Sequence, residues 1–172
     1  MTEIETRDRI YRYVTRHPGT HLRQIQRELN ISLGTLRHHL ASLEDEGLLE
    51  SRKERRFRRF FASGKVDARL KPYLGPLRQD RLRRVVLCLL TGGPMRYTDL
   101  LQDLMIPEST LALYLRILMD ARIIKRRKQG ADSVYEVRNE DAIRDVLRIL
   151  RRAVLDELAD RALEIFEESS RR

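Results

Sequence analysis

An internal repeat is the feature of this sequence that most limits its fold. When the chain is shifted along itself by 75 positions, its two halves align without a gap. The residues of the first half that recur unchanged at the shifted positions are Leu29, Ile31, Thr35, Leu36, Leu40, Leu43, Asp45, Arg52 and Lys53. Two copies predict a tandem pair of small domains, because a solenoid needs at least three repeats.

Both copies show the same order of predicted elements. In the first copy, apolar residues at helical spacing stop at Pro18-Gly19, Thr20 and Ser32 are predicted to cap two further helices, and a two-stranded hairpin follows. The predicted helices are 2–17, 20–29 and 32–47 in the first copy and 82–90, 97–105 and 108–121 in the second, with hairpins over 48–62 and 123–137. This is the order of a winged helix-turn-helix domain.

We therefore predict a mainly α-helical fold with small β-hairpin wings. The predicted parts are a DNA-reading domain over 1–63, a linker over 64–76, a second winged helix-turn-helix domain over 77–138 and a long C-terminal helix over 139–172. Glycine and proline residues mark the linker, since they favour turns over regular elements.

The third helix of the first copy carries a family pattern. The pattern Ser-x-x-Thr-apolar-x-x-His-Leu-x-x-Leu-x-x-x-Gly-Leu is met by Ser32, Thr35, Leu36, His39, Leu40, Leu43, Gly47 and Leu48. On these residues the chain resembles ArsR/MarR-type transcription regulators, and as a whole it is similar to archaeal regulators built from two such modules. The resemblance implies DNA binding and control of transcription. The second copy departs from the pattern, with Tyr114 in place of the histidine and Arg122 in place of the glycine.

The outward face of this third helix is a predicted DNA-reading surface. At 100° per residue, Leu36, Leu40 and Leu43 share the core face, and His39 lies at its edge as a packed histidine. The residues that we predict to contact bases or phosphates are Ser32, Gly34, Thr35, Arg37 and His38. The alternative is an ordinary solvated helix face.

The same face of the second copy has a different character. Leu113 and Ile117 stand where the first copy has His38 and Ser42. Exposed apolar side chains favour a contact with protein, so we predict that this helix packs against another subunit or the C-terminal helix. The alternative is entry into DNA with apolar contacts to thymine methyl groups.

The hairpins carry the densest charge. The chain has 35 Lys and Arg against 26 Asp and Glu, a net charge of +9, and six of the nine residues over 51–59 are basic. Phosphate contacts are predicted for Arg52, Lys53, Arg55, Arg56 and Arg58, with Phe57 on the opposite face of its strand from Arg56 and Arg58. The second wing, 125–128, is a weaker copy.

A C-terminal helix is predicted from its cap at Asn139 to about residue 169. Its apolar stripe includes the predicted partner-interface residues Ile143, Leu147, Leu150, Val154 and Leu158. A dimerising helix is the favoured interpretation, and packing back across both domains of one chain is the alternative.

No enzyme signature, cofactor motif, metal-ligand cluster or small-molecule effector site is evident in the sequence. Cys88 is interpreted as a core residue, with redox sensing as the alternative. The sequence has no membrane span or signal peptide and predicts a cytoplasmic protein. We thus predict a homodimeric, sequence-specific regulator of transcription that binds double-stranded DNA; the rival hypothesis is a tandem winged-helix scaffold in a multisubunit assembly.

Overall fold

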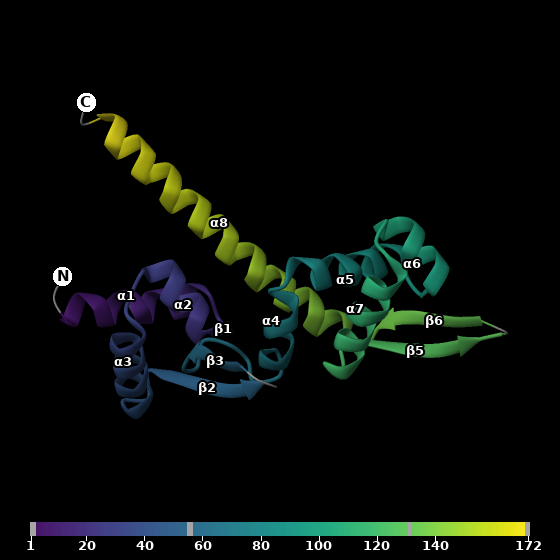
Figure 1. Ribbon diagram of the computed structural model, residues 1–172, viewed down its shortest axis with the longest axis horizontal. Coiled ribbons are helices and arrows are strands. Elements are labelled where there is room, and N and C mark those ends of the chain that lie inside the picture. The colour runs from purple at the N-terminus through teal and green to yellow at the C-terminus, as the bar shows by residue number, and fades with distance from the viewer. Residues whose placement is uncertain (1–2, 55–56, 131, 171–172) are drawn as a thin grey trace. The chain divides into compact units, whose positions relative to one another are not determined.

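The structure, a computed structural model, describes residues 3–54, 57–130 and 132–170, apart from the side chains of residue 157 and residues 160–170 (Figure 1). The chain forms two compact units. Unit 1 comprises Met1–Lys71 and Arg148–Arg172, and unit 2 comprises Pro72–Leu147. The described elements are mainly helices, with one small antiparallel sheet in each unit, so the predicted fold class is confirmed.

Unit 1 has the predicted order of helices and strands. Its elements are α1 (Glu3–Arg16), β1 (Thr20–His21), α2 (Leu22–Leu29), α3 (Leu33–Asp45), β2 (Leu49–Glu54) and β3 (Phe57–Ala62). The apolar stripes of the three helices meet in one core, to which the largest contributors are Ile10, Val14, Ile25, Leu36, Leu40, Leu43 and Phe60. His39 is buried beside this core, as its position on the helix predicted.

A third strand, β1, was missed by the sequence analysis. Thr20 pairs with Phe60 of β3, so the sheet order is β1-β3-β2 where only a two-stranded hairpin was predicted. The prediction that Thr20 caps the second helix is wrong for the same reason, because its pairing in the sheet buries it completely. The cap is His21, whose Nδ1 accepts a hydrogen bond from the backbone N–H of Gln24 at 3.2 Å.

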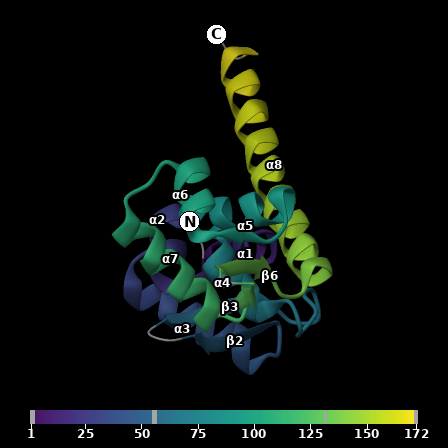
Figure 2. The ribbon, with the colours of Figure 1, turned by 90° about the vertical axis from the view of Figure 1, so that its right-hand side faces the viewer.

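Unit 2 repeats this plan, and Figure 2 turns it toward the viewer. Its elements are α4 (Lys71–Leu77), α5 (Asp80–Gly92), β4 (Met95–Arg96), α6 (Tyr97–Leu104), α7 (Glu108–Asp120), β5 (Ile124–Gln129), β6 (Asp132–Val137) and the start of α8 (Glu140–Ser170). The sheet order is β4-β6-β5, so this unit also gains a two-residue strand that the sequence analysis did not predict. Helix α4 lies at the end of the predicted linker.

The turn after the third helix has the same backbone conformation in both units but a different residue type. Gly47 has a φ of 72°, and Arg122, at the shifted position, has a φ of 56°. Glycine adopts this left-handed conformation without steric cost, whereas a residue with a Cβ does not. The backbone geometry is therefore kept in unit 2, although the glycine that suits it is not.

Helix α8 begins at its predicted cap. The Asn139 side-chain oxygen accepts a hydrogen bond from the backbone N–H of Ala142 at 3.3 Å. Ile143 is fully buried and Leu150 is only 6% exposed, so neither is available to a partner, contrary to their predicted place in a partner interface. Their side chains belong to the apolar interior because the first turns of α8 are covered within the chain.

Candidate nucleic-acid interface

The outward face of α3 is open and positively charged. Arg37 and His38 are exposed, and a Cβ added at Gly34 would meet only the Ser32 hydroxyl, 4.0 Å away. Among the described residues, no carboxylate pairs with Arg37. This side chain is therefore available to donate to an acceptor outside the chain.

Two of the predicted contact residues form the cap of α3. The Ser32 hydroxyl accepts a hydrogen bond from the backbone N–H of Thr35 at 3.1 Å, and the two hydroxyls lie 2.8 Å apart. Both residues are exposed at the N-terminal end of the helix. They fix the first turn of α3, and their hydroxyl groups remain at the surface that Gly34 opens.

His38 lies beside the start of α1. Its Nε2 is 3.6 Å from a carboxylate oxygen of Glu3, and both side chains are largely exposed. This contact places an acidic group at one margin of the face. Among the described residues, no carboxylate is paired with Arg37 in this way.

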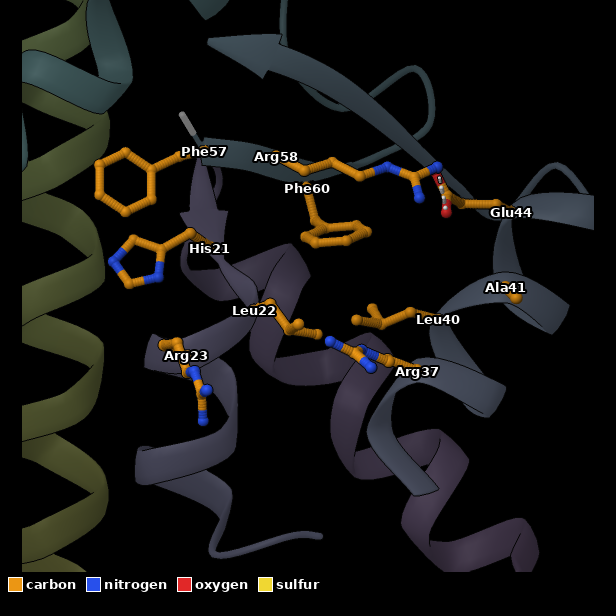
Figure 3. Close-up of a pocket in the computed structure, with 10 residues that line it drawn as sticks. All are labelled: His21, Leu22, Arg23, Arg37, Leu40, Ala41, Glu44, Phe57, Arg58 and Phe60. Atoms are coloured by element: carbon orange, nitrogen blue, oxygen red, sulfur yellow. Dashed lines mark hydrogen bonds and ion pairs between the residues drawn. The ribbon is translucent and has the colours of Figure 1, made fainter. Parts of the chain in front are cut away.

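A groove separates α3 from the wing (Figure 3). It is a cavity of about 570 Å³, lined by His21, Leu22, Arg23, Arg37, Leu40, Ala41, Glu44, Phe57, Arg58 and Phe60. His21 and Arg23 were missed by the sequence analysis, because the strand β1 that brings the start of α2 to the wing has no sequence pattern. The His21 and Phe57 rings stack with centroids 5.0 Å apart.

The basic residues of the first wing have different surroundings. Arg52 and Lys53 are exposed on β2. Arg58 is bound by Glu44 and Ser51. Arg59 is buried and donates to the Gly19 carbonyl and to Glu54, both at 3.0 Å.

The predicted contacts Arg55 and Arg56 lie outside the described residues. Phe57 and Arg58 occupy opposite faces of β3, as strand alternation predicted. The charge that the described wing offers to a ligand is thus smaller than its sequence indicates.

Unit 2 presents different chemistry at the equivalent positions. Leu113 of α7 is 50% exposed and Ile117 is half-buried, so the outward face is apolar as predicted. On the wing, Glu136 accepts from Lys125 at 2.9 Å and from Arg127 at 2.8 Å. Hydrogen bonds from Arg127 and Lys125 lower the pKa of Glu136 below its ordinary value of 4.5. Both cations are therefore paired within the wing.

Further along α8, apolar side chains reach the surface. Val154, Leu155 and Leu158 are each about half exposed, while Leu147 is half-buried. Leu158 is three and four residues from the other two, so all three lie on one side of the helix. Val154 and Leu158 belong to the predicted partner interface, and Leu155 extends the same exposed apolar surface.

Cys88 is half-buried, rather than in the core as predicted, and its Sγ lies 3.7 Å from both Met95 Sδ and Asp103 Oδ2. Burial, and then the Asp103 carboxylate, raise the pKa of its thiol above the ordinary value, which disfavours the reactive thiolate.

The described residues bring together no group of three His, Cys, Asp or Glu that could hold a metal ion. Within the same residues, no helix has the length and apolar character needed to cross a membrane.

Two domain families match the chain, one in each half. Residues 4–71 match a family described as an N-terminal HTH domain, and residues 80–126 match the family described as "Bacterial regulatory protein, arsR family". The chain carries two helix-turn-helix domains. Neither matched family is one of enzymes. The two matches fall on the two copies of the repeat, so both halves of this tandem helix-turn-helix protein keep the fold despite their different surfaces.

Relatives of this tandem helix-turn-helix protein include the "Uncharacterized HTH-type transcriptional regulator MJ1398" of Methanocaldococcus jannaschii, 29% identical over 140 residues. The alignment covers 81% of this chain and 35% of that protein, so the chain spans about a third of its relative's length. Rv0081 of M. tuberculosis has a similar structure, with 23% identity and a TM-score of 0.46, covering 56% of this chain and 99% of that one. The repressor PagR of Bacillus anthracis has 23% identity and a TM-score of 0.41, covering 48% of this chain and 91% of that one.

Proposed function

We propose that this protein is a transcriptional regulator that binds double-stranded DNA in a sequence-specific manner. In this proposal α3 of unit 1 enters the major groove and the first wing lies along the flanking backbone. The observation that carries the proposal is Arg37, which is exposed on α3 beside the open surface at Gly34 and pairs with no carboxylate of the described residues. A guanidinium in this position can donate to both acceptors of a guanine edge.

Each predicted contact except Arg58 has a part in this proposal. At the start of α3, Ser32 and Thr35 share one hydroxyl proton between them, and the other is donated to phosphate or to a base edge. His38 extends the donor surface, and phosphate contacts are proposed for Arg52, Lys53, Arg55 and Arg56. These phosphate contacts supply affinity without reading sequence.

The proposed regulator is a homodimer. The exposed apolar side chains Val154, Leu155 and Leu158 support pairing of α8 with a second copy, because such a group on one helix face is typical of a protein contact. Unit 2 and α8 then set the spacing of the two half-sites. Measurement of molecular size at micromolar concentration tests this, and we expect a dimer that Leu155→Glu and Leu158→Glu convert to a monomer.

The decisive experiment for DNA reading is selection of bound sequences from a random duplex pool. We expect a defined motif, palindromic if the protein binds as a symmetric dimer. Arg37→Ala should abolish enrichment of the motif while the protein stays folded. Recovery of no motif, with duplex binding absent or insensitive to salt, would contradict the proposal.

A second candidate function is that of a protein scaffold. The exposed Leu113 on α7 and the paired wing cations of unit 2 favour it for that unit, because both features suit a protein partner better than a polyanion. The unpaired Arg37 and the exposed Arg52 and Lys53 favour DNA for unit 1. The same selection experiment decides between the two functions.

A further inference from the structure

The strongest unexplained feature of unit 1 is an ion pair between the recognition helix and the wing. Arg58 of β3 donates from Nη2 to both oxygens of Glu44 on α3, at 3.0 and 2.9 Å, and from Nε to the Ser51 hydroxyl at 2.6 Å. Figure 3 shows the Arg58 side chain reaching across the groove to Glu44. From the sequence, Arg58 was predicted to contact phosphate, and no role in DNA binding was predicted for Glu44.

The two side chains differ in their exposure to solvent. The Glu44 side chain is 18% exposed, and the Arg58 side chain is 62% exposed. Arg58 is the cation paired with Glu44 among the described residues. A sheltered carboxylate that loses its cation carries a desolvation penalty, so Glu44 opposes the departure of Arg58. The Phe60 ring, 5.6 Å from the guanidinium carbon, also holds Arg58 in this place.

The pair also limits where a phosphate can approach. An anion that bound Arg58 here would lie beside the Glu44 carboxylate, and the two negative charges would repel one another. This repulsion acts at the C-terminal part of α3, while Arg37 and Gly34 lie toward its N-terminal part. The ion pair therefore disfavours a phosphate at Arg58.

We propose that Glu44 holds Arg58 as a positioning residue of the wing and withholds its charge from the phosphate backbone. This inference rests on the proposed function, since it concerns how the same site contacts DNA. Sequence-independent affinity comes from phosphate contacts, so each arginine withheld from the backbone lowers that affinity. Glu44 therefore limits the sequence-independent part of DNA binding and its dependence on salt.

Lys53 offers a matched control on the same wing. It stands directly opposite Arg58 in the register of the hairpin and on the same face, and it is exposed. Among the described residues, no carboxylate pairs with Lys53. Its charge is thus available to a phosphate, whereas that of Arg58 is already matched by Glu44.

The test is the salt dependence of duplex binding by the full chain and its variants. Each phosphate contact contributes about 0.9 to the slope of log affinity against log salt. We expect Arg58→Gln to leave the slope unchanged, Glu44→Gln to steepen it by about 0.9, and the double variant to restore the wild-type slope. Lys53→Gln should reduce the slope by about 0.9.

Binding to a duplex without the selected motif gives the second measurement. Glu44→Gln should raise this non-specific affinity by about fivefold at physiological salt, because one further phosphate contact is gained. The amide keeps the shape of the carboxylate, and thermal unfolding confirms that each variant is folded.

Two results would overturn the inference. A slope reduced by about 0.9 in Arg58→Gln, with Glu44 present, would show that Arg58 leaves Glu44 for the backbone on binding. An unchanged slope in Glu44→Gln would show that the freed arginine does not reach a phosphate. In both cases the wild-type protein still binds duplex DNA and the proposed function stands; absence of wild-type binding would overturn both proposals.

Discussion

The two units share the same order of helices and strands, and they differ in the side chains that the third helix and the wing present to solvent. In unit 1 the outward face of α3 offers Arg37, and the wing offers Arg52 and Lys53. In unit 2 the same face offers Leu113, and Glu136 binds two of the wing cations. A repeat of this kind therefore conserves the core while the surface chemistry of each copy becomes specialised, and the fold alone does not say which copy binds DNA.

One position accounts for much of the difference between the wings. Glu136 of β6 corresponds, at the repeat offset, to Phe61 of β3, which is buried in unit 1. Arg127 corresponds to Arg52, and both are exposed, but Glu136 pairs with Arg127 whereas no carboxylate among the described residues pairs with Arg52. Net charge counted along the sequence misses this, because a cation paired within the wing adds little to the field outside it.

The largest contrast should come from the third helices. Arg37→Ala should cost about 1–3 kcal/mol of binding free energy on the selected duplex, because a two-pronged contact to guanine is lost. Arg116→Ala, which removes the exposed arginine of α7, should change the affinity by less than about twofold if unit 2 does not read DNA. Titration of a labelled duplex measures both, and equal losses would show that both units read bases.

The turns after the third helices should respond in opposite directions. Gly47→Ala should destabilise the protein by about 1–2 kcal/mol, because its φ of 72° places a new Cβ in the left-handed region. Arg122→Gly should stabilise it by about 1 kcal/mol, because it removes the same strain in unit 2. Chemical denaturation measures both free energies of unfolding. Loss of stability in Arg122→Gly would mean that the arginine side chain contributes more than the strain costs.

The identical arginines of the two wings give a smaller contrast. Arg52→Gln should reduce the slope of log affinity against log salt by about 0.9, because the substitution removes one cation that contacts the phosphate backbone. Arg127→Gln should leave the slope unchanged, because Glu136 already matches its charge. Affinities measured over a series of salt concentrations give both slopes. A reduced slope in Arg127→Gln would place the second wing on DNA.

The smallest effect is a pH dependence that should arise in unit 2. The folded-state pKa of Glu136 lies below the unfolded value, so its ion pairs stabilise the fold above about pH 4.5 and this contribution is lost as the pH falls through the depressed pKa. Glu136→Gln should remove that part of the acid sensitivity. Thermal unfolding between neutral pH and pH 3 measures it, with Glu50→Gln on the first wing as the comparison. An unchanged acid profile would show that the pair has no net effect.

The helices of both units could be predicted from the sequence because their apolar residues recur at helical spacing and build the cores. The strands β1 and β4 could not be predicted, because a two-residue strand is too short to show an alternating pattern. Their pairing also depends on a strand that is distant in the sequence. Arg58 and Arg59 are adjacent in a basic run, yet one binds Glu44 and the other is buried against Gly19. Their partners come from other elements, and only the folded chain brings them together.

The short strand β1 has a consequence for how unit 1 is made. Arg59 binds the Gly19 carbonyl across 40 residues of chain, and Thr20 pairs with Phe60 at the same separation. On the ribosome, α1, α2 and α3 emerge before β3 exists, so the sheet can close only after the hairpin has been synthesised. Contacts of this separation slow folding because a long loop must be ordered first. The contacts that join the wing to the start of α2 can therefore form only after β3 has been synthesised.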